Sequence, residues 1–173
     1  MGMDVHGLNP KENKTYDDFP VLEEMESINF KDRWEILDAD EETRETYWKQ
    51  KDEFDKANPG SYFRNNCWWW RPLWDYCFLV DNLGLISREL YESGHSNNGA
   101  GLNGEDAKLL GALLLAEIAN GGTIKYQAEY QQKMNDLDED DFSRHYPFDV
   151  DNVRDFALFC LESGGFEILW MLG

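Results

Sequence analysis

The residues best suited to ligand chemistry gather in one aromatic stretch, Tyr62 to Trp74. Four of the chain's seven tryptophans lie there, and arginines stand at positions 64 and 71. A guanidinium beside indoles suits cation–π stacking and flat anionic or nucleobase-like ligands. Successive residues step about 100° around a helix axis and alternate sides on a strand, so Trp68, Trp69 and Trp70 cannot all face one core. At least one of these indoles is expected to meet a second layer, a partner or a ligand.

Two asparagines separate Arg64 from the indoles. Their amides carry donors and acceptors and can read the polar edge of a ligand. We therefore predict that Arg64, Asn65, Trp69 and Arg71 line a binding pocket. The alternative is that the arginines anchor acidic neighbours while the indoles fill a core between layers, as tryptophan commonly does.

A second candidate is the glycine-rich segment from Gly94 to Asn103, which precedes an expected helix. Free backbone N–H groups and the helix dipole favour an anion at such a position. The segment lacks the Gly-Lys-Ser/Thr of a P-loop, and it is not a GxGxxG turn after a strand. We expect His95, Ser96 and Asn98 to contact the ligand. An ordinary connector with an asparagine cap is the alternative.

Signals for catalysis and metal binding are weak. His6, His95 and His145 are far apart, so the fold would have to gather them into a metal site. The acidic run Asp138–Asp141 lacks the alternation and central glycine of a calcium loop. No GxSxG motif occurs. We therefore favour a non-enzymatic protein without a cofactor or metal; the alternatives are His95 as a general base and a hydrolase whose acidic residues converge from distant helices.

The charge is strongly acidic, with a net value of −19 from 35 acidic and 16 basic residues. The net charges of residues 1–56, 57–123 and 124–173 are −9, −3 and −7, so the aromatic stretch lies in the least acidic third. A backbone binder of nucleic acid needs clustered Lys and Arg, and an anionic membrane would repel this chain. We expect neither contact, but attraction to a basic partner. The alternative is that the acids only cover solvated faces.

Periodicity predicts a mainly α protein with a small β-sheet made by the terminal strands, an α+β fold. A hydrophobic fraction of 42% and a length of 173 residues suit one domain, residues 1–173. The expected strands are Met3–Gly7 and Phe166–Met171, and they should pair. The expected helices cover Trp68–Val80 with Pro72 in the first turn, Leu85–Tyr91, a segment capped by Asn103 and ending at Asn120, a segment carrying Tyr126 and Tyr130, and a last segment from Asp151.

Residues 12–57 are predicted to form an acidic helical insertion within this domain. Asp40-Glu41-Glu42 is typical of a helix start. The acidic side chains expected to meet a basic partner are Asp38, Asp40, Glu41, Glu42 and Glu45.

The cysteine pattern indicates a reducing compartment. Cys67, Cys77 and Cys160 are odd in number and have no CxxC spacing, so we expect reduced, mostly buried thiols. The start of the chain lacks the features of a secretory signal, and no apolar run is long enough to span a bilayer. We expect a cytoplasmic protein.

Four segments together resemble a known family. They are Met1–Gly7, Tyr62–Leu73 with its Tyr-Phe-Arg-Asn-Asn-Cys-Trp-Trp-Trp-Arg-Pro-Leu sequence, Ser96–Leu102, and Tyr146–Phe166 with its Ser-Gly-Gly-Phe end. The chain resembles small uncharacterised proteins encoded by bacteria and bacteriophages. The resemblance covers about two thirds of the chain. It implies a bacterial cytoplasm, that of the host cell if the chain is phage-encoded, and no particular activity.

The chain departs from that family in three places. His6 stands where tyrosine is expected, and residues 10–57 look inserted. Some relatives carry paired cysteines before the Tyr146-Pro147 segment, where this chain is acidic, so their metal-knuckle role is not expected here.

Two functions follow as hypotheses. The first is a non-enzymatic protein that sequesters a small polar or nucleotide-like ligand, as an anti-defence sponge of a phage would. The second is an acidic inhibitor that binds the basic nucleic-acid-binding surface of a host or phage enzyme. Exposed aromatics are compatible with a homodimer in either case.

Overall fold

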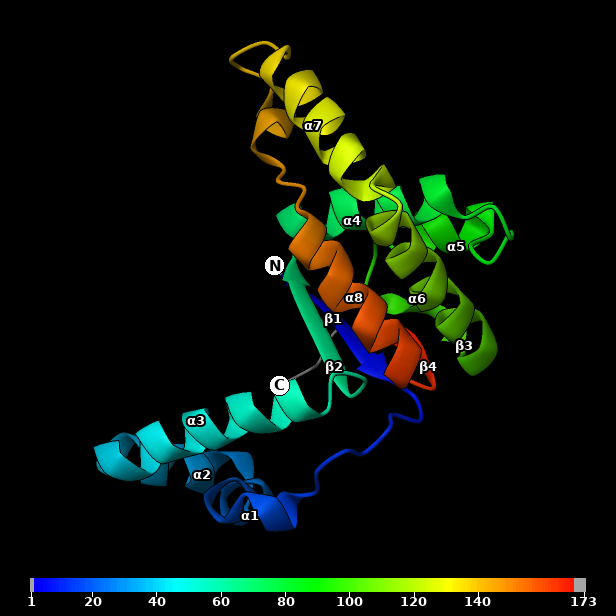
Figure 1. Cartoon of the computed structure of the whole chain (residues 1–173). Helices are drawn as coiled ribbons and strands as arrows, with labels where there is room; N and C mark the ends of the chain where they lie inside the picture. The colour runs from blue at the N-terminus through cyan, green and yellow to red at the C-terminus, as the bar shows by residue number, and fades with distance from the viewer. Residues whose placement is uncertain (1, 170–173) are drawn as a thin grey trace. The chain divides into compact units, whose positions relative to one another are not determined.

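The structure is a computed structural model that describes residues 2–169, and the chain divides into two compact units (Figure 1). One unit combines residues 2–11 with residues 59–169. The other is Glu12–Asn58, the segment expected to be an insertion. The fold is mainly α-helical with one small antiparallel sheet, which confirms the predicted fold class.

The sheet belongs to the larger unit and has the strand order β2-β1-β4-β3. The strands are β1 (Gly2–Gly7), β2 (Tyr62–Asn66), β3 (Asn98–Asn103) and β4 (Gly165–Leu169). The predicted pairing of β1 with β4 is confirmed, and Val5 lies opposite Ile168 with both side chains fully buried. The last two residues of the predicted strand, 170 and 171, lie outside the described residues.

The expectation that the remaining chain is helical is wrong for β2 and β3. β2 pairs with β1, and β3 pairs with β4, so both outer strands form on partners distant in sequence. β3 falls within the glycine-rich segment expected to be a loop. At Gly101 the two backbones come so close that an added Cβ would lie 1.7 Å from the carbonyl oxygen of Phe166. Only glycine fits there, and the lack of a side chain is what allows this strand pairing.

Helices cover the sheet and complete the core of this unit. They are α4 (Cys67–Val80), α5 (Arg88–Ser93), α6 (Gly104–Ala119), α7 (Gly122–Asn135), α8 (Val150–Glu162) and the short 3-10 helix η2 (Phe142–His145). α6 packs along α8, and Figure 1 shows the two helices side by side. The core between helices and sheet contains Trp70, Leu110, Phe156 and Phe166, all fully buried.

Local capping sets most helix starts. The Asn66 side chain accepts hydrogen bonds from the backbone N–H groups of Trp68 and Trp69, both at 3.1 Å. α4 therefore begins at Cys67, and Pro72 is its sixth residue rather than a first-turn residue, which corrects the prediction. The cap predicted at Asn103 is confirmed by its 2.9 Å hydrogen bond from the N–H of Asp106.

Two other starts differ from the prediction for the same reason. Ser87 caps α5 by accepting from the N–H of Leu90 at 3.1 Å, so this helix starts at Arg88 rather than near Leu85. Asp149 caps α8, which starts at Val150, one residue before the predicted Asp151.

No single helix in residues 2–169 has both the length and the apolar character to cross a membrane. Within the same residues, α6 and α7 are long and apolar enough only when taken together, and they are bent by 77° at the break between them.

The smaller unit, Glu12–Asn58, is helical and has its own core. It contains the 3-10 helix η1 (Tyr16–Asp18), α1 (Pro20–Ser27), α2 (Phe30–Ala39) and α3 (Glu41–Ala57). Its hydrophobic core consists of the buried side chains Phe19, Leu22, Met25, Leu37 and Tyr47. The helix start predicted at Asp40 is confirmed, because the Asp40 side chain caps α3.

Candidate functional site: a tyrosine-lined cleft

The three consecutive indoles do not all face one core, as predicted. Trp70 is fully buried, stacks on Trp74 at a centroid distance of 5.4 Å and donates from Nε1 to the Gly94 carbonyl at 2.8 Å. Trp68 packs edge-on against Phe142 at 4.5 Å. Trp69 is 36% exposed. The alternative that the indoles fill a core is correct for Trp70, whereas Trp69 is accessible to other molecules.

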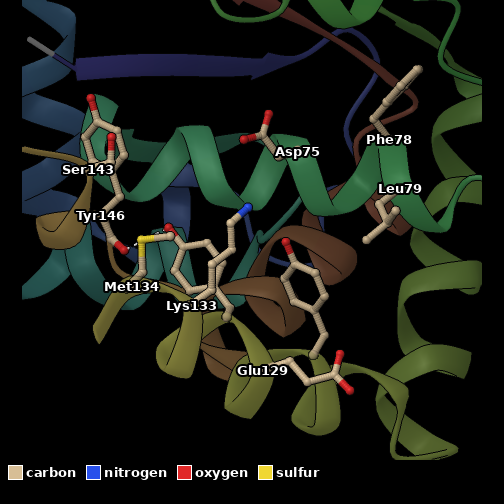
Figure 2. Close-up of a pocket in the computed structure, with 10 residues that line it drawn as sticks. Asp75, Phe78, Leu79, Glu129, Lys133, Met134, Ser143 and Tyr146 are labelled. Carbon is tan, nitrogen blue, oxygen red and sulfur yellow. Dashed lines mark hydrogen bonds between the residues drawn. The ribbon is translucent and has the colours of Figure 1, made fainter. Parts of the chain in front are cut away.

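A cleft of about 800 Å³ opens between α4 and α7. Its lining residues are Asp75, Phe78, Leu79, Tyr126, Glu129, Tyr130, Lys133, Met134, Ser143 and Tyr146. Figure 2 shows Asp75 and Leu79 on α4, Glu129 and Lys133 on α7, and Tyr146 at one end. The Lys133 side chain extends from α7 towards α4 (Figure 2). Aromatic walls with a few polar groups are the usual lining of a small-molecule site.

A second hollow of about 310 Å³ adjoins this cleft. It is lined by Arg71, Pro72, Asp75, Tyr91, His95, Tyr130 and Tyr146. Asp75, Tyr130 and Tyr146 line both hollows. We treat the two as one site and call it the tyrosine cleft.

Asp75 is the centre of a hydrogen-bond network at the junction. Its Oδ1 accepts from the Tyr91 hydroxyl at 2.7 Å and lies 3.2 Å from His95 Nε2. Burial alone would raise the pKa of Asp75, but the hydrogen bonds from His95 and Tyr91, with the positive charge of Arg71 nearby, hold this pKa below its ordinary value. The network therefore keeps a carboxylate charge in the cleft.

The Tyr91 and Tyr130 phenols of the cleft stay protonated near neutral pH. The hydrogen bond to Asp75, together with burial, raises the pKa of Tyr91 to about 12. Burial, with nearby tyrosines and Asp75, raises the pKa of Tyr130 to about 12. These hydroxyls are therefore hydrogen-bond donors and acceptors rather than anions.

Tyr146 is held in place from two sides. Arg71 donates from Nη1 to the Tyr146 hydroxyl at 3.0 Å, and its guanidinium lies 5.8 Å from the centroid of the same ring. The Tyr130 hydroxyl donates to the Tyr146 carbonyl at 2.9 Å. A ring fixed in this way is a preorganised surface for a flat ligand.

His95 turns one ring nitrogen to Asp75 and has no hydrogen-bond partner for the other. Nδ1 is buried and has no partner within residues 2–169. The imidazole packs edge-on against Tyr91 at a centroid distance of 5.1 Å. Since Nδ1 is covered, the geometry suits a positioning group better than a base that must reach a substrate.

The other predicted ligand residues lie elsewhere. Arg64, Asn65 and Trp69 line a separate, shallower hollow of about 370 Å³ together with Asn66, Asp149, Asn152 and Asp155. The Asn65 and Asn152 amides satisfy each other through hydrogen bonds of 3.0 and 2.9 Å. Arg64 Nε lies 3.5 Å from Asp4 Oδ1.

Ser96 and Asn98 line neither the tyrosine cleft nor the hollow beside Trp69. Asn98 lies in β3 opposite Leu169, and its side chain accepts from the N–H of Ala100 at 3.3 Å. The structure thus brings Arg71 and His95 together and separates them from the other predicted residues. Arg64 and Arg71 line different hollows because Arg64 lies on strand β2 and Arg71 lies on the following helix, α4.

Sequence reasoning missed Asp75, Tyr130, Lys133 and Tyr146. A signal for one of them was present, because Asp75 follows Arg71 by four residues and shares its helix face. Tyr146 enters the site only through the tertiary fold, and no local pattern marks it.

The five acidic residues predicted to meet a partner are all exposed on the smaller unit. Asp40 is used internally, since it accepts from the N–H groups of Glu42 and Thr43 and from the Thr43 hydroxyl. The hydrogen bonds from Thr43 lower the pKa of Asp40. Glu41 lies 3.7 Å from Arg44.

Within residues 2–169, no group of three or more His, Cys, Asp or Glu side chains is arranged to hold a metal ion. No protein-family model, curated protein or solved structure matches the chain. The geometry of the tyrosine cleft is therefore the main basis for assigning a function.

The Asp75 network predicts a definite pH dependence of stability. Because the pKa of Asp75 is lower in the folded protein than its ordinary 3.8, its carboxylate stabilises the fold above that value, and the contribution is lost as pH falls through the folded pKa. The difference in unfolding free energy between the wild type and Asp75→Asn should therefore stay constant well above pH 3.8 and shrink as the pH falls below 3.8 through the folded pKa. Urea unfolding at a series of pH values measures it.

Asp155→Asn is the matched control, because burial and Asp151 raise the pKa of Asp155. A raised folded pKa means that the charged carboxylate destabilises the fold. The unfolding free energy of the wild type should therefore rise relative to that of Asp155→Asn as the pH is lowered. The same trend for both variants would contradict the Asp75 network.

Proposed function

We propose that the protein binds and sequesters a small, flat, polar ligand of nucleotide-like chemistry in the tyrosine cleft, without transforming it. The observation that carries the proposal is the fixed aromatic wall of Tyr130 and Tyr146 with the cations Arg71 and Lys133 beside it. The proposal retains the class of function predicted from the sequence. It assigns that function to the tyrosine cleft instead of the hollow beside Trp69.

The aromatic lining supports a flat ligand. Tyr126 and Tyr130 on α7 face the α4 wall that carries Phe78, and all three line the cleft. Aromatic side chains offer stacking surfaces that are tolerant of base identity, and such stacking contributes about 1–3 kcal/mol per base in nucleic-acid complexes. A cleft of about 800 Å³ is within the usual range for a drug-sized or nucleotide-sized molecule.

The charges support a polar ligand with an anionic group. Lys133 has no ion-pair partner in residues 2–169, and the one side-chain hydrogen bond described for Arg71 goes to the Tyr146 hydroxyl. Both cations are therefore free to meet a phosphate or carboxylate, which Arg and Lys bind well. The Tyr126 and Tyr130 hydroxyls, whose pKa burial raises, can hydrogen-bond the polar edge of a base.

Binding without chemistry is supported by what the site residues already do. Asp75 is occupied by Tyr91 and His95, and His95 Nδ1 is covered. Ser143 supplies a hydroxyl to the lining, but both its backbone N–H and its side chain hydrogen-bond the Asp141 carboxylate, and these bonds lower the pKa of Asp141 and make it a weak base. The cleft is built to hold a ligand by contacts that are already in place.

The resemblance to bacterial and phage proteins gives this binding a setting, again as a proposal. A phage protein that captures a host signalling nucleotide would remove it from a defence pathway. Such a sponge needs affinity and abundance rather than turnover, and a preorganised cleft provides affinity by reducing the ordering cost of binding.

The test is a thermal-shift screen of the whole chain with mononucleotides, dinucleotides and cyclic nucleotides, followed by calorimetric titration of any hit. A ligand present at about 100 times its Kd should stabilise the fold by about 2.7 kcal/mol. Lys133→Gln and Arg71→Gln should each weaken the hit about tenfold or more, since hydrogen bonds to charged groups contribute about 1.5–3 kcal/mol.

Two controls make the result decisive. Lys125→Gln changes an exposed lysine on the same helix, which pairs loosely with Glu129 at 3.9 Å, and should leave binding unchanged. Arg64→Gln changes the hollow beside Trp69 and should also leave it unchanged. A screen without hits would refute the proposal, and a hit lost only in Arg64→Gln would move the site to the surface first predicted.

A further inference from the structure

A second surface, in the smaller unit, carries an exposed cluster of aromatic side chains. Phe30 is 66% exposed and Trp48 is 45% exposed. The rings of Phe30 and Trp34 lie 5.9 Å apart, and those of Trp34 and Trp48 lie 6.2 Å apart. We call these three residues the aromatic patch. It spans two helices, α2 and α3, that contact each other in this unit.

The core of this unit is built from other side chains, and the patch meets it where the Trp48 ring packs edge-on against Tyr47 at a centroid distance of 4.9 Å. The same helices supply Leu37 and Tyr47 to that core, and both of these side chains are buried. The Tyr47 hydroxyl donates to Glu26 at 2.7 Å, so this side of α3 is already anchored. Large exposed aromatics gathered in one place mark an interaction surface far more often than singly exposed ones do.

The edge of the patch carries negative charge that the unit does not neutralise. Asp38 follows Trp34 by four residues, and Glu45 precedes Trp48 by three, so each lies one turn from an indole on the same helix face. Neither has an ion-pair partner among the residues that the structure describes.

Neighbouring acids on these helices are paired. Glu35 lies 3.8 Å from Lys31, and Asp52 lies 2.6 Å from Lys56. Asp38 and Glu45, in contrast, leave unneutralised charge beside the patch. This pattern of apolar centre and charged edge matches the anatomy of a binding site with aromatic anchors.

We propose that the aromatic patch, edged by Asp38 and Glu45, docks a basic amphipathic helix of a partner protein. The apolar residues of that helix would cover Phe30, Trp34 and Trp48, and its Lys or Arg residues would face the two free acids. Two packed helices offer ridges and grooves into which a third helix fits, and such a helix is read through anchors spaced three or four residues apart. This inference does not depend on the tyrosine cleft.

The negative charge of this chain argues against other molecules as the occupant of the aromatic patch. The chain has a net charge of −19, so a second copy would set acids against acids at the patch edge. Nucleic acid and anionic lipid would be repelled in the same way. A partner with a basic surface was expected from composition, and the patch adds an apolar requirement that composition alone does not contain.

The experiment uses the full chain and two synthetic peptides of about 18 residues, or five helical turns. Both peptides contain the same Leu, Lys and Arg residues. In one they are ordered so that the leucines share a helix face, and in the other they are scrambled. Calorimetric titration at low and moderate salt gives each Kd. The ordered peptide should bind about tenfold tighter or more than the scrambled one.

Three variants locate the contact. Phe30→Ser with Trp48→Ser should weaken the ordered peptide about tenfold or more, whereas Trp69→Ser, an exposed tryptophan of the larger unit, should not. Asp38→Asn with Glu45→Gln should weaken it and reduce its salt dependence. Circular dichroism checks that each variant remains folded, and nucleotide binding by the Phe30/Trp48 variant checks that the cleft is intact.

Several results would overturn the proposal. Equal affinity for both peptides would mean that they bind through charge attraction alone. No binding of the ordered peptide, or binding that ignores the Phe30/Trp48 change, would mean that the patch is not a docking site for such a helix. Sedimentation that shows a concentration-dependent dimer, lost in the Phe30/Trp48 variant, would mean that a second copy is the occupant.

Discussion

Trp70→Ala should lower the unfolding free energy by about 3–5 kcal/mol, the cost expected for removing a fully buried aromatic side chain. Trp70 is completely buried, stacks on Trp74 and meets Phe156 edge-on at 5.5 Å. The truncation also leaves the Gly94 carbonyl without its 2.8 Å hydrogen bond from the indole. Urea unfolding followed by far-ultraviolet circular dichroism measures the loss without relying on tryptophan fluorescence.

The adjacent residue provides the control. Trp69→Ala removes the same atoms from a side chain that is partly exposed and should cost about 1 kcal/mol or less. Comparable losses at positions 69 and 70 would contradict the placement of α4, because a rotation of about 100° is all that separates the two environments.

Gly101→Ala should be the most damaging single-methyl addition, with a loss of about 3 kcal/mol. The new Cβ would lie 1.7 Å from the Phe166 carbonyl oxygen and 2.7 Å from its carbon. Both contacts are with backbone, which cannot rotate away, so β3 would have to separate from β4. Hydrogen exchange of the β3 amides should increase together with the drop in unfolding free energy.

Gly84→Ala separates crowding from backbone conformation. Gly84 has a φ of 71° and open space around its Cβ position, so alanine there costs only the left-handed conformation, about 1 kcal/mol. If Gly101→Ala proved no more harmful than Gly84→Ala, the close approach of β3 and β4 would be in error.

Features that depend on nearby residues could be predicted from the sequence. Asn103 and Asp40 each hold the start of a helix through bonds to residues two or three positions away, and the sequence contains both partners. The same applies to the division of the three indoles, which follows from helix geometry alone. The β1–β4 pair was found because both strands have apolar residues such as Val5 and Ile168 at alternate positions.

Features that depend on residues distant in the sequence could not be predicted from it. β3 reads Asn-Gly-Ala-Gly-Leu-Asn, a composition that disfavours strands, and it is a strand because β4 supplies its hydrogen bonds. Pro72 was placed too early because nothing in the aromatic run shows that Asn66 rather than a later residue caps α4.

The candidate site shows the same limit. Arg71 and His95 were both selected, but as parts of different surfaces, and only the fold joins them through Asp75. Tyr146 reaches the cleft from a segment 75 residues beyond Arg71. Residue chemistry therefore identified plausible participants, while their grouping required the tertiary structure.

The position of β4 has a consequence for folding during synthesis on the ribosome. β1 emerges before both of its partners in the sheet, and one of them, β4, begins only at Gly165. β1 can meet β2 once residue 66 has emerged, yet the central pair must close a loop of about 160 residues, and such long-range closure is slow. β1 therefore presents an unpaired edge until β4 has emerged, and such an edge exposes the nascent chain to association with other chains.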